Sequence, residues 1–247
     1  MISVLKNFFI IQLLLFFSCQ DQQSLTAENL IAKSVEAYGF DKIKLALEFD
    51  FRDYHYELIR KPSFYSYSRE TQKEGKRIKD VMNSEKKLQR YVNDSLISLS
   101  DSITNVFSNS LNSVLYFFQL PKLLQDPAVI AEIKDPIQIK GILYWTLKIT
   151  FNQEGGGEDF QDEYRYWINK RTFLIDYLAY NYIRDDGGTR FRKAINQRKI
   201  ESFIFQDYEN YTSEQKYISL DKLPILYMEG KLKQVSMIEN KNISYLK

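Results

Sequence analysis

The chain has 247 residues, and its 34 Lys and Arg residues nearly balance its 32 Asp and Glu residues. A formal net charge of +2 gives no reason to expect nucleic acid or a strongly acidic partner. Aromatic residues make up 15% of the chain, whereas it has only 9 Gly and 5 Pro. This composition is typical of strands, because aromatic side chains pack well on a pleated, half-buried surface.

Residues 1–18 have the features of a secretory signal. Lys6 supplies a positive charge, an apolar run follows from Phe8 to Phe17, and the small Ser18 precedes Cys19. The apolar run of about ten residues is too short for a membrane-spanning helix, which needs roughly 20. We therefore expect residues 1–18 to be removed.

Cys19 is the only cysteine, so an internal disulfide is excluded. Residues 15–19, Leu-Phe-Phe-Ser-Cys, resemble a lipobox, the recognition sequence of bacterial lipoprotein signal peptidase. The resemblance implies that Cys19 is the acylated mature N-terminus; the alternative is an ordinary cleaved signal with an incidental cysteine. Two or more acyl chains give stable anchoring. We expect residues 19–25 to be a tether, and the protein to be lipid-anchored in the cell envelope, at the periplasmic face of the outer membrane.

Residues 26–247 predict a single α+β domain, beginning with a helix over 27–38. Thr26 is a good N-cap for this helix and Gly39 ends it. From residue 45 the apolar residues alternate with a period of two, which indicates half-buried strands. The predicted strands are 45–52, 54–60, 64–69, 78–82, 88–92 and 96–99.

A central helix is expected over 100–120, capped by Ser100 and ended by Pro121. Its first half is amphipathic, with an apolar face made of Ile103, Val106, Phe107 and Leu111. Its second half, residues 114–118, is apolar on every side and must be enclosed by protein or ligand. We place it inside a curled sheet.

Strands resume after the central helix, and their connections have the composition of hairpin turns. Sequential antiparallel pairing is the simplest topology. The predicted fold is α+β: a curled antiparallel sheet, or half-barrel, with the N-terminal and central helices on its concave face. The later elements are strands over 131–139, 142–151, 161–168, 173–182, 190–198 and 203–211, a short helix over 221–227 and a strand over 234–240.

The sequence predicts no catalytic residue, no metal and no cofactor, and we expect the protein not to be an enzyme. His55 is the only histidine and Cys19 the only cysteine, so a Ser-His-acid or Cys-His catalytic arrangement has few residues to draw on. A His-rich metal site is excluded. The acidic, Gly-rich segments 154–163 and 185–188 are interpreted as turns. A calcium site or a glycosidase pair of carboxylates is the alternative for them.

Arg190 and Arg192 flank Phe191, so the two arginines should share one face of a strand and Phe191 the other. The first interpretation is cross-strand pairing with acids such as Asp176 or Glu163. The second is a cationic rim for an anionic head group.

A curled sheet with few helices inside can leave room for a ligand. Core packing is the competing explanation for each inward-facing aromatic residue. The ligand-cavity candidates are Phe49, Phe51, Tyr65, Tyr67, Tyr116, Phe117, Trp145, Trp167 and Tyr180.

A set of short motifs runs through the chain, among them Asn112-Ser113-Val114, Asp126-Pro127-Ala128-Val129, Trp167-Ile168, Asp176-Tyr177 and Arg190-Phe191-Arg192. Together they resemble an uncharacterised domain family of envelope lipoproteins from Bacteroidota-type bacteria, over most of residues 26–240. The family has no established activity, so the resemblance implies no functional residue. Where relatives often carry His-Gly-Gly after the first helix, this chain has Tyr38-Gly39-Phe40.

The order of elements also looks like the half-barrel of periplasmic lipoprotein-sorting carriers, which hold acyl chains between a curled sheet and its helices; fold alone does not establish function. The first functional hypothesis is an envelope lipoprotein that binds or carries a lipid or acyl chain in the half-barrel. The alternative is a structural or interaction lipoprotein with a fully packed core and no ligand. A third is a hydrolase that uses the acidic loops.

Overall fold

The structure is a computed structural model that describes residues 25–42, 44–154, 161–183 and 187–246. The expected signal, Cys19 and most of the tether lie outside the described residues. So do residues 155–160 and 184–186, which hold much of the two acidic, Gly-rich segments.

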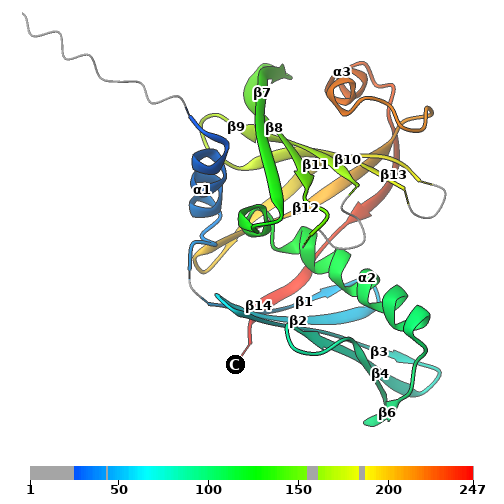
Figure 1. Ribbon diagram of the computed structural model, residues 1–247. Helices are drawn as coiled ribbons and strands as arrows, with labels where there is room; N and C mark the ends of the chain where they lie inside the picture. Colours follow the sequence, from blue (N-terminus) through cyan, green and yellow to red (C-terminus); the bar gives the residue numbers. More distant parts are fainter. Residues whose placement is uncertain (1–24, 43, 155–160, 184–186, 247) are drawn as a thin grey trace, which may run out of the picture.

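Two seven-stranded antiparallel sheets form the body of the molecule (Figure 1). The first has the order β14-β1-β2-β3-β4-β5-β6, and the second has the order β13-β12-β11-β10-β9-β8-β7. The first sheet consists of β1 (Leu45–Phe51), β2 (Tyr54–Lys61), β3 (Phe64–Lys73), β4 (Lys76–Asn83), β5 (Gln89–Val92), β6 (Ser95–Ile97) and β14 (Lys241–Tyr245). The second consists of β7 (Val129–Ile139), β8 (Ile142–Phe151), β9 (Glu163–Asn169), β10 (Ile175–Tyr182), β11 (Gly188–Ile200), β12 (Phe203–Thr212) and β13 (Lys233–Ile238).

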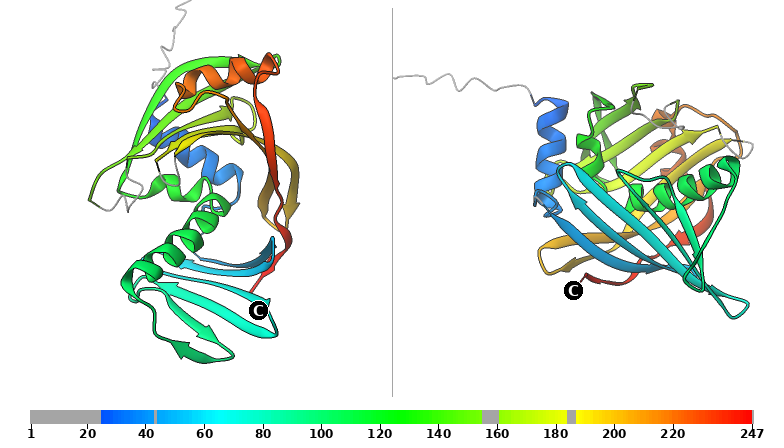
Figure 2. Two further views of the ribbon diagram at one scale, coloured as in Figure 1. Left: turned by 90° about the vertical axis from the view of Figure 1, so that its right-hand side faces the viewer. Right: turned by 60° about the horizontal axis from the view of Figure 1, so that its bottom comes forward.

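The two sheets are joined by their last strands, which follow each other in the chain. β13 pairs with β12 and β14 pairs with β1, and only Glu239 and Asn240 separate β13 from β14. Figure 2 shows this C-terminal segment running from one sheet into the other. The backbone N–H of Asn240 donates to Asp207 Oδ1 at 3.0 Å, which holds the bend against β12.

The predicted fold class is confirmed: the molecule is a curled antiparallel arrangement with a few helices, and it is not closed into a barrel. The difference from the prediction is the division into two sheets at the bend after β13. Strand β14 was not predicted, because only Ile243 in it is buried and the segment shows no alternating apolar pattern.

Helix α1 (Ala27–Ala37) begins and ends where the sequence predicts. Thr26 Oγ1 accepts a hydrogen bond from the backbone N–H of Asn29 at 3.2 Å. After the helix, the Tyr38 hydroxyl accepts a hydrogen bond from the backbone N–H of Ile175 at 3.1 Å. Gly39 has a φ of +74°, and a Cβ there would lie 2.1 Å from the carbonyl oxygen of Ser202. The Tyr38-Gly39 corner therefore docks α1 against the second sheet.

Helix α2 (Asp101–Phe118) lies between the two sheets (Figure 2). Its buried row is Thr104, Leu111, Leu115 and Phe118. The predicted apolar face of its first half is wrong in part, because Ile103 and Val106 are 45% and 62% exposed and Thr104 is buried. The helix packs on the first sheet through the row of residues that contains Thr104. Ile103 and Val106 lie beside this row and face outward.

A buried ion cluster ties α2 to the first sheet. The carboxylate of Asp80, 1% exposed, accepts hydrogen bonds from Arg69 Nε at 2.8 Å and Arg90 Nε at 2.7 Å. Arg69 Nη1 also donates to Ser110 Oγ on α2 at 2.8 Å. The Arg90 guanidinium carbon lies 3.5 Å from the centroid of the Phe107 ring. Both arginines thus connect the Asp80 carboxylate with the helix.

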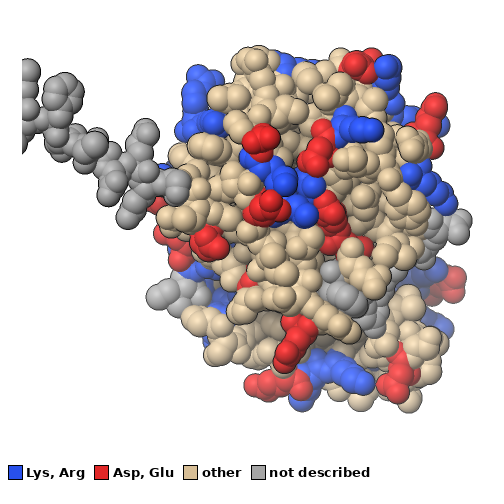
Figure 3. Space-filling view, turned by 45° about the horizontal axis from the view of Figure 1, so that its top comes forward, with Lys and Arg blue, Asp and Glu red and all other residues tan. Residues whose placement is uncertain are grey.

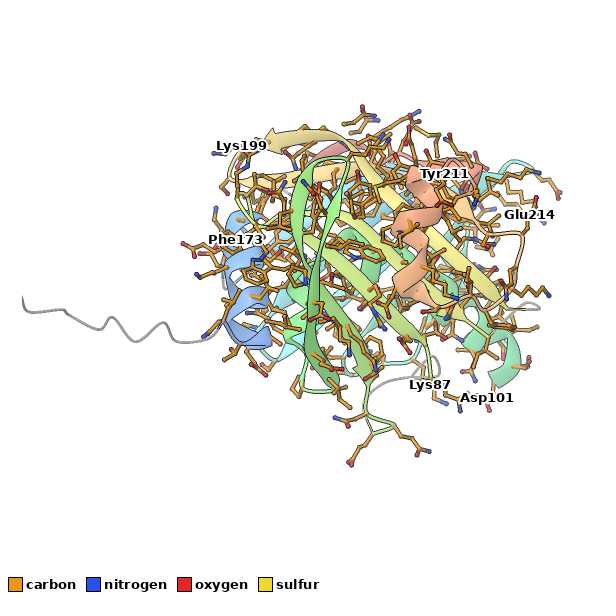
Figure 4. The ribbon with its side chains drawn as sticks, turned by 90° about the horizontal axis from the view of Figure 1, so that it is seen from above. Lys87, Asp101, Phe173, Lys199, Tyr211 and Glu214 are labelled. Carbon is orange, nitrogen blue, oxygen red and sulfur yellow. The ribbon has the colours of Figure 1, made fainter. Side chains whose placement is uncertain are left out.

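The hydrophobic core consists of two clusters, one on each face of the second sheet. The larger lies between the sheets around Leu115 and Phe118. The smaller lies on the outer face of the second sheet, beneath η2 (Leu220–Lys222) and α3 (Leu223–Met228). In Figure 4 α3 crosses the strands close to Tyr211, whose ring lies 5.4 Å from that of Tyr227.

The charged residues of the outer surface are mixed in sign. Figure 3 shows basic and acidic side chains side by side on the face that it presents. Examples are the ion pairs of Lys134 with Glu132 at 3.1 Å and of Lys231 with Glu229 at 2.8 Å. Among the described residues, none of the helices combines the length and hydrophobicity that a membrane-spanning segment needs.

Candidate functional site

A cleft with a volume of about 650 Å³ lies between α2 and the concave face of the second sheet. Helix α2 contributes Ser113, Val114 and Phe117 to its lining, and the strands contribute residues of β10, β11, β12 and β13. Ligand pockets in proteins commonly measure about 300–1,000 Å³. The cleft is therefore large enough for a small ligand or part of a larger one.

One wall of the cleft is aromatic. The ring of Phe117 lies 5.3 Å from that of Tyr180 between centroids, and Tyr180 lies 5.4 Å from Tyr164 and 6.0 Å from Tyr182. Phe51, at the end of β1, also lines the cleft. Aromatic rings at such spacings form a continuous surface that can bind an apolar chain or another ring.

The floor of the cleft is polar and centres on Arg192, which is 8% exposed. Its Nη2 donates to the Tyr180 hydroxyl at 2.8 Å. Its guanidinium carbon lies 3.9 Å from the centroid of the Phe117 ring, a cation–π contact between β11 and α2. Its Nε has no hydrogen-bond partner among the described residues. A buried guanidinium nitrogen without an acceptor is unusual, because desolvation of a charged donor is costly.

A row of polar side chains continues from Arg192 across the sheet. Arg192 lies opposite Asn210 on β12, and Asn210 lies opposite Ser236 on β13. Asn210 Nδ2 donates to Ser236 Oγ at 3.0 Å, whereas its Oδ1 is buried without a partner among the described residues. Whichever way the amide is turned, one of its polar atoms stays unsatisfied. The row therefore offers hydrogen-bonding capacity that the surrounding residues leave unused.

The prediction that Arg190 and Arg192 share a face opposite to Phe191 is confirmed. Both arginines line the cleft, and Phe191 belongs to the cluster on the outer face. The Nη1 of Arg190 donates to the Thr189 carbonyl at 3.1 Å and to Thr212 Oγ1 at 3.3 Å. The Arg190 guanidinium carbon lies 4.9 Å from the centroid of the Tyr182 ring, at one side of the cleft.

The acids expected to pair with the two arginines are engaged elsewhere. Asp176 accepts hydrogen bonds from the Tyr144 hydroxyl and from Asn169 Nδ2, both at 3.0 Å. Glu163 pairs with Arg165 at 2.6 Å. Pairing with Asp176 or Glu163 is therefore not the role of Arg190 and Arg192. The cationic rim for an anionic head group stays a prediction.

The structure brings Phe51, Phe117 and Tyr180 together in the cleft, out of the aromatic candidates chosen from the sequence. Phe49 is instead fully buried and stacks on Phe118. Tyr116 lies next to the cleft, and its hydroxyl is 3.4 Å from that of Tyr166. Burial raises the pKa of Tyr116 to about 12.

The remaining candidates lie away from the cleft. Tyr67 is buried and accepts a hydrogen bond from Gln119 Nε2 at 3.0 Å. Its ring is tilted against that of Tyr65, with centroids 4.7 Å apart. Trp145 is half-buried under the amino group of Lys170, which lies 3.6 Å from its ring. Trp167 lies in the cluster on the outer face of the second sheet. The residues of β9 from Tyr164 onward are buried on both faces, so alternation alone could not place Trp167.

Several cleft residues were not singled out from the sequence, namely Tyr182, Tyr208, Asn210 and Ser236. Tyr208 and Asn210 are two residues apart on one strand, so the period of two could have placed both on the concave face. Nothing in the sequence shows that Asn210 lies opposite Arg192, because this depends on the register of β11 and β12.

The other candidates for chemistry fall outside the cleft or outside the described residues. His55 is a surface residue whose Nδ1 lies 2.7 Å from Asp50 Oδ1. In the described part of the chain, no group of three or more His, Cys, Asp or Glu side chains is arranged to hold a metal ion. The acidic, Gly-rich segments 154–163 and 185–188, predicted to be turns, fall partly on residues 155–160 and 184–186, which lie outside the described residues.

Residues 6–240 match the model of a family of unknown function, DUF6503. The chain belongs to this family. Membership of an uncharacterised domain family was expected from the motifs and is confirmed, whereas the Bacteroidota origin stays a prediction. None of the curated proteins matches the chain significantly.

Three solved structures are similar to the chain over most of its length. A DUF1329 family protein from Desulfovibrio piger is 13% identical with a TM-score of 0.43, and the match covers 89% of this chain and 92% of that one. A LolA superfamily protein from Nitrosomonas europaea is 13% identical with a TM-score of 0.49, over 91% and 95%. A putative outer membrane lipoprotein-sorting protein domain from Vibrio parahaemolyticus is 7% identical with a TM-score of 0.47, over 89% and 93%. Similarities at this level leave the function to be inferred from the residues of this chain.

Proposed function

We propose that this DUF6503 protein is an envelope lipoprotein that binds one acyl chain or a similar apolar ligand in the cleft beside α2. In this proposal residues 1–18 are a signal peptide, acylated Cys19 holds the protein on the periplasmic face of the outer membrane, and residues 19–25 connect it to a single domain over 26–247. The ligand-binding role is one of capture rather than catalysis.

The observation that carries this proposal is the cleft of about 650 Å³ with an aromatic wall. Phe117 of α2 and Tyr180 of β10 contact each other within this wall. A hollow lined by aromatic rings releases water when an apolar chain enters, and the stabilisation is about 25 cal/mol per Å² of apolar surface buried.

The competing hypothesis of a structural lipoprotein is supported by the rest of the concave side, which is filled by its own side chains. Phe49 and Leu115 are fully buried and Phe118 is 7% exposed. The ligand of the proposal is therefore confined to the cleft, and the half-barrel does not enclose a large lipid.

Native mass spectrometry of the full chain with Cys19→Ser tests the proposal, because this variant carries no acyl chains of its own. We expect co-purified species with the masses of single-chain lipids. Ser113→Trp, at the mouth of the cleft, should remove them. The matched control is Val106→Trp, which places the same side chain at a position of α2 that is 62% exposed. This variant should retain the bound lipids. A chain that carries no ligand, even after incubation with fatty acid, would favour the structural hypothesis.

The anchor is tested separately by metabolic labelling with a radioactive fatty acid. We expect label and membrane fractionation in the wild-type chain and neither in Cys19→Ser. Label that persists in Cys19→Ser would place the modification elsewhere and contradict the lipoprotein assignment.

A further inference from the structure

We propose that the cleft selects ligands with an anionic head group, a carboxylate or a phosphate, and that the buried guanidinium of Arg192 binds it. This inference rests on the proposed ligand-binding function and adds the chemical class of the ligand. It follows from the state of Arg192, from the charge of the cleft lining and from the polar row beside it.

The environment of Arg192 leaves binding capacity unused. An arginine side chain stays charged and offers five N–H donors. At 8% exposure it is largely withdrawn from water, and its described contacts are all with neutral groups: the Tyr180 hydroxyl and the rings of Phe117 and Tyr180. Its Nε donates to no described residue. Burial of a charge is strongly unfavourable unless the charge is compensated, and an anionic ligand would supply the compensation.

The described lining of the cleft has an excess of positive charge. Arg52, Arg190 and Arg192 line it, against the single carboxylate of Asp162. A single acid balances at most one of the three guanidinium groups. The charges of the described lining therefore favour an anion, and burial between protein walls strengthens this preference relative to open water.

The position of Arg192 relative to the aromatic wall fits an amphiphile. Phe117 and Tyr180, which contact the guanidinium, also form the wall along which an apolar chain would lie. A head group at Arg192 would place the chain against these rings. A guanidinium matches a carboxylate or phosphate with two parallel N–H donors, a geometry that an ammonium does not provide.

Asn210 adds a second polar contact at the head group. It lies opposite Arg192 in the sheet, it is 8% exposed, and one of its amide atoms has no described partner. A ligand oxygen or hydroxyl bound by Arg192 would lie within reach of this amide. The site thus consists of a charged donor, an amide and an aromatic wall.

Isothermal titration calorimetry of the full chain with Cys19→Ser tests the inference with three probes of one chain length: laurate, dodecyl phosphate and dodecanol, each as monomers in solution. We expect one or both anions to bind at least about tenfold more tightly than the alcohol, since hydrogen bonds to charged groups contribute on this scale. The comparison of laurate with dodecyl phosphate distinguishes a fatty acid from a phosphorylated lipid as the source of the anion.

Arg192→Gln should abolish the preference for anions and leave the binding of dodecanol almost unchanged. The control Arg171→Gln removes an exposed arginine at the β9–β10 turn and should have no effect. If circular dichroism shows that Arg192→Gln does not fold, the affinities of the three probes for the Cys19→Ser chain still test the preference for anions. Arg190→Gln is then the second variant, and it should weaken anion binding severalfold. Equal affinity for the anions and the alcohol would overturn the inference and leave the proposed function intact. Failure of all three probes to bind would overturn both.

Discussion

The ring of Phe49 on β1 stacks face to face on the ring of Phe118, the last residue of α2, with centroids 3.7 Å apart and planes 6° from parallel. Phe118 also stacks on Phe205 of β12, with ring centroids 5.2 Å apart. Phe118 therefore contacts both sheets at once and fixes the end of α2 that borders the cleft.

Replacement of Phe118 by alanine should destabilise the protein strongly. The change removes a buried ring that stacks on two others, and Phe→Ala in a packed core costs about 3–5 kcal/mol of unfolding free energy. Urea unfolding followed by circular dichroism measures the loss. The control Val106→Ala, at a 62% exposed position on the same helix, should change the free energy of unfolding by no more than about 0.5 kcal/mol. Equal effects of the two substitutions would show that the stack does not hold α2.

Gly39→Ala should destabilise the protein more than Gly75→Ala does. Both glycines have a positive φ, +74° and +70°, so the backbone strain of an added Cβ is similar. At Gly39 the Cβ would also lie 2.1 Å from the Ser202 carbonyl oxygen, whereas nothing lies within 4 Å at Gly75. The difference between the two melting temperatures isolates the close approach of the α1 corner to the second sheet. Identical melting temperatures would contradict this docking.

The order of the elements could be predicted from the sequence because the signals are local. Thr26 and Ser100 cap the two long helices as expected, since each side chain bonds the backbone N–H three residues later. The alternation of Arg190, Phe191 and Arg192 also placed each side chain on the right face of the second sheet. The alternation of apolar residues and the capping of helices both depend on residues close together in the sequence, so both can be recognised without a structure.

The cleft and the division into two sheets depend on long-range register, which the sequence does not reveal. The site arises because Arg192, Asn210 and Ser236 come into one row from three strands. The sheet divides at the bend near Asn240, where no apolar alternation marks the change of partner. Trp167 lies in a strand that is buried on both faces, so its side of the sheet is set by pairing rather than by pattern.

Asp80→Asn should be among the most destabilising polar substitutions in the chain. Asp80 is 1% exposed and compensates both Arg69 and Arg90, so its neutralisation leaves two guanidinium groups in a buried site. Removal of one partner of a buried ion pair costs about 3–5 kcal/mol. Asp94→Asn is the matched control, because the pair of Asp94 with Arg77 is exposed and such pairs contribute about 0–1 kcal/mol. A loss at position 80 as small as that at position 94 would mean that the cluster is not needed to hold α2.

The ion pair of Asp221 with Arg165 should make stability depend on pH in acid. The hydrogen bond from Arg165 lowers the pKa of Asp221 below its ordinary value of 3.8. The folded state therefore binds this proton less readily than the unfolded state, and the stabilisation is present above the unfolded pKa and lost as pH falls through the folded one. The difference in melting temperature between the wild-type chain and Asp221→Asn should be constant above about pH 5 and shrink below about pH 4. A difference that stays constant through the acid range would contradict the shift.

The most direct test of the central claim is a crystal structure of the full chain with Cys19→Ser, bound to a long-chain carboxylate that carries bromine at its far end. The account predicts the carboxylate at the guanidinium of Arg192 and an anomalous bromine peak within the cleft, along the wall formed by Phe117 and Tyr180. A bromine peak outside the cleft, or an empty cleft at saturating ligand, would contradict it.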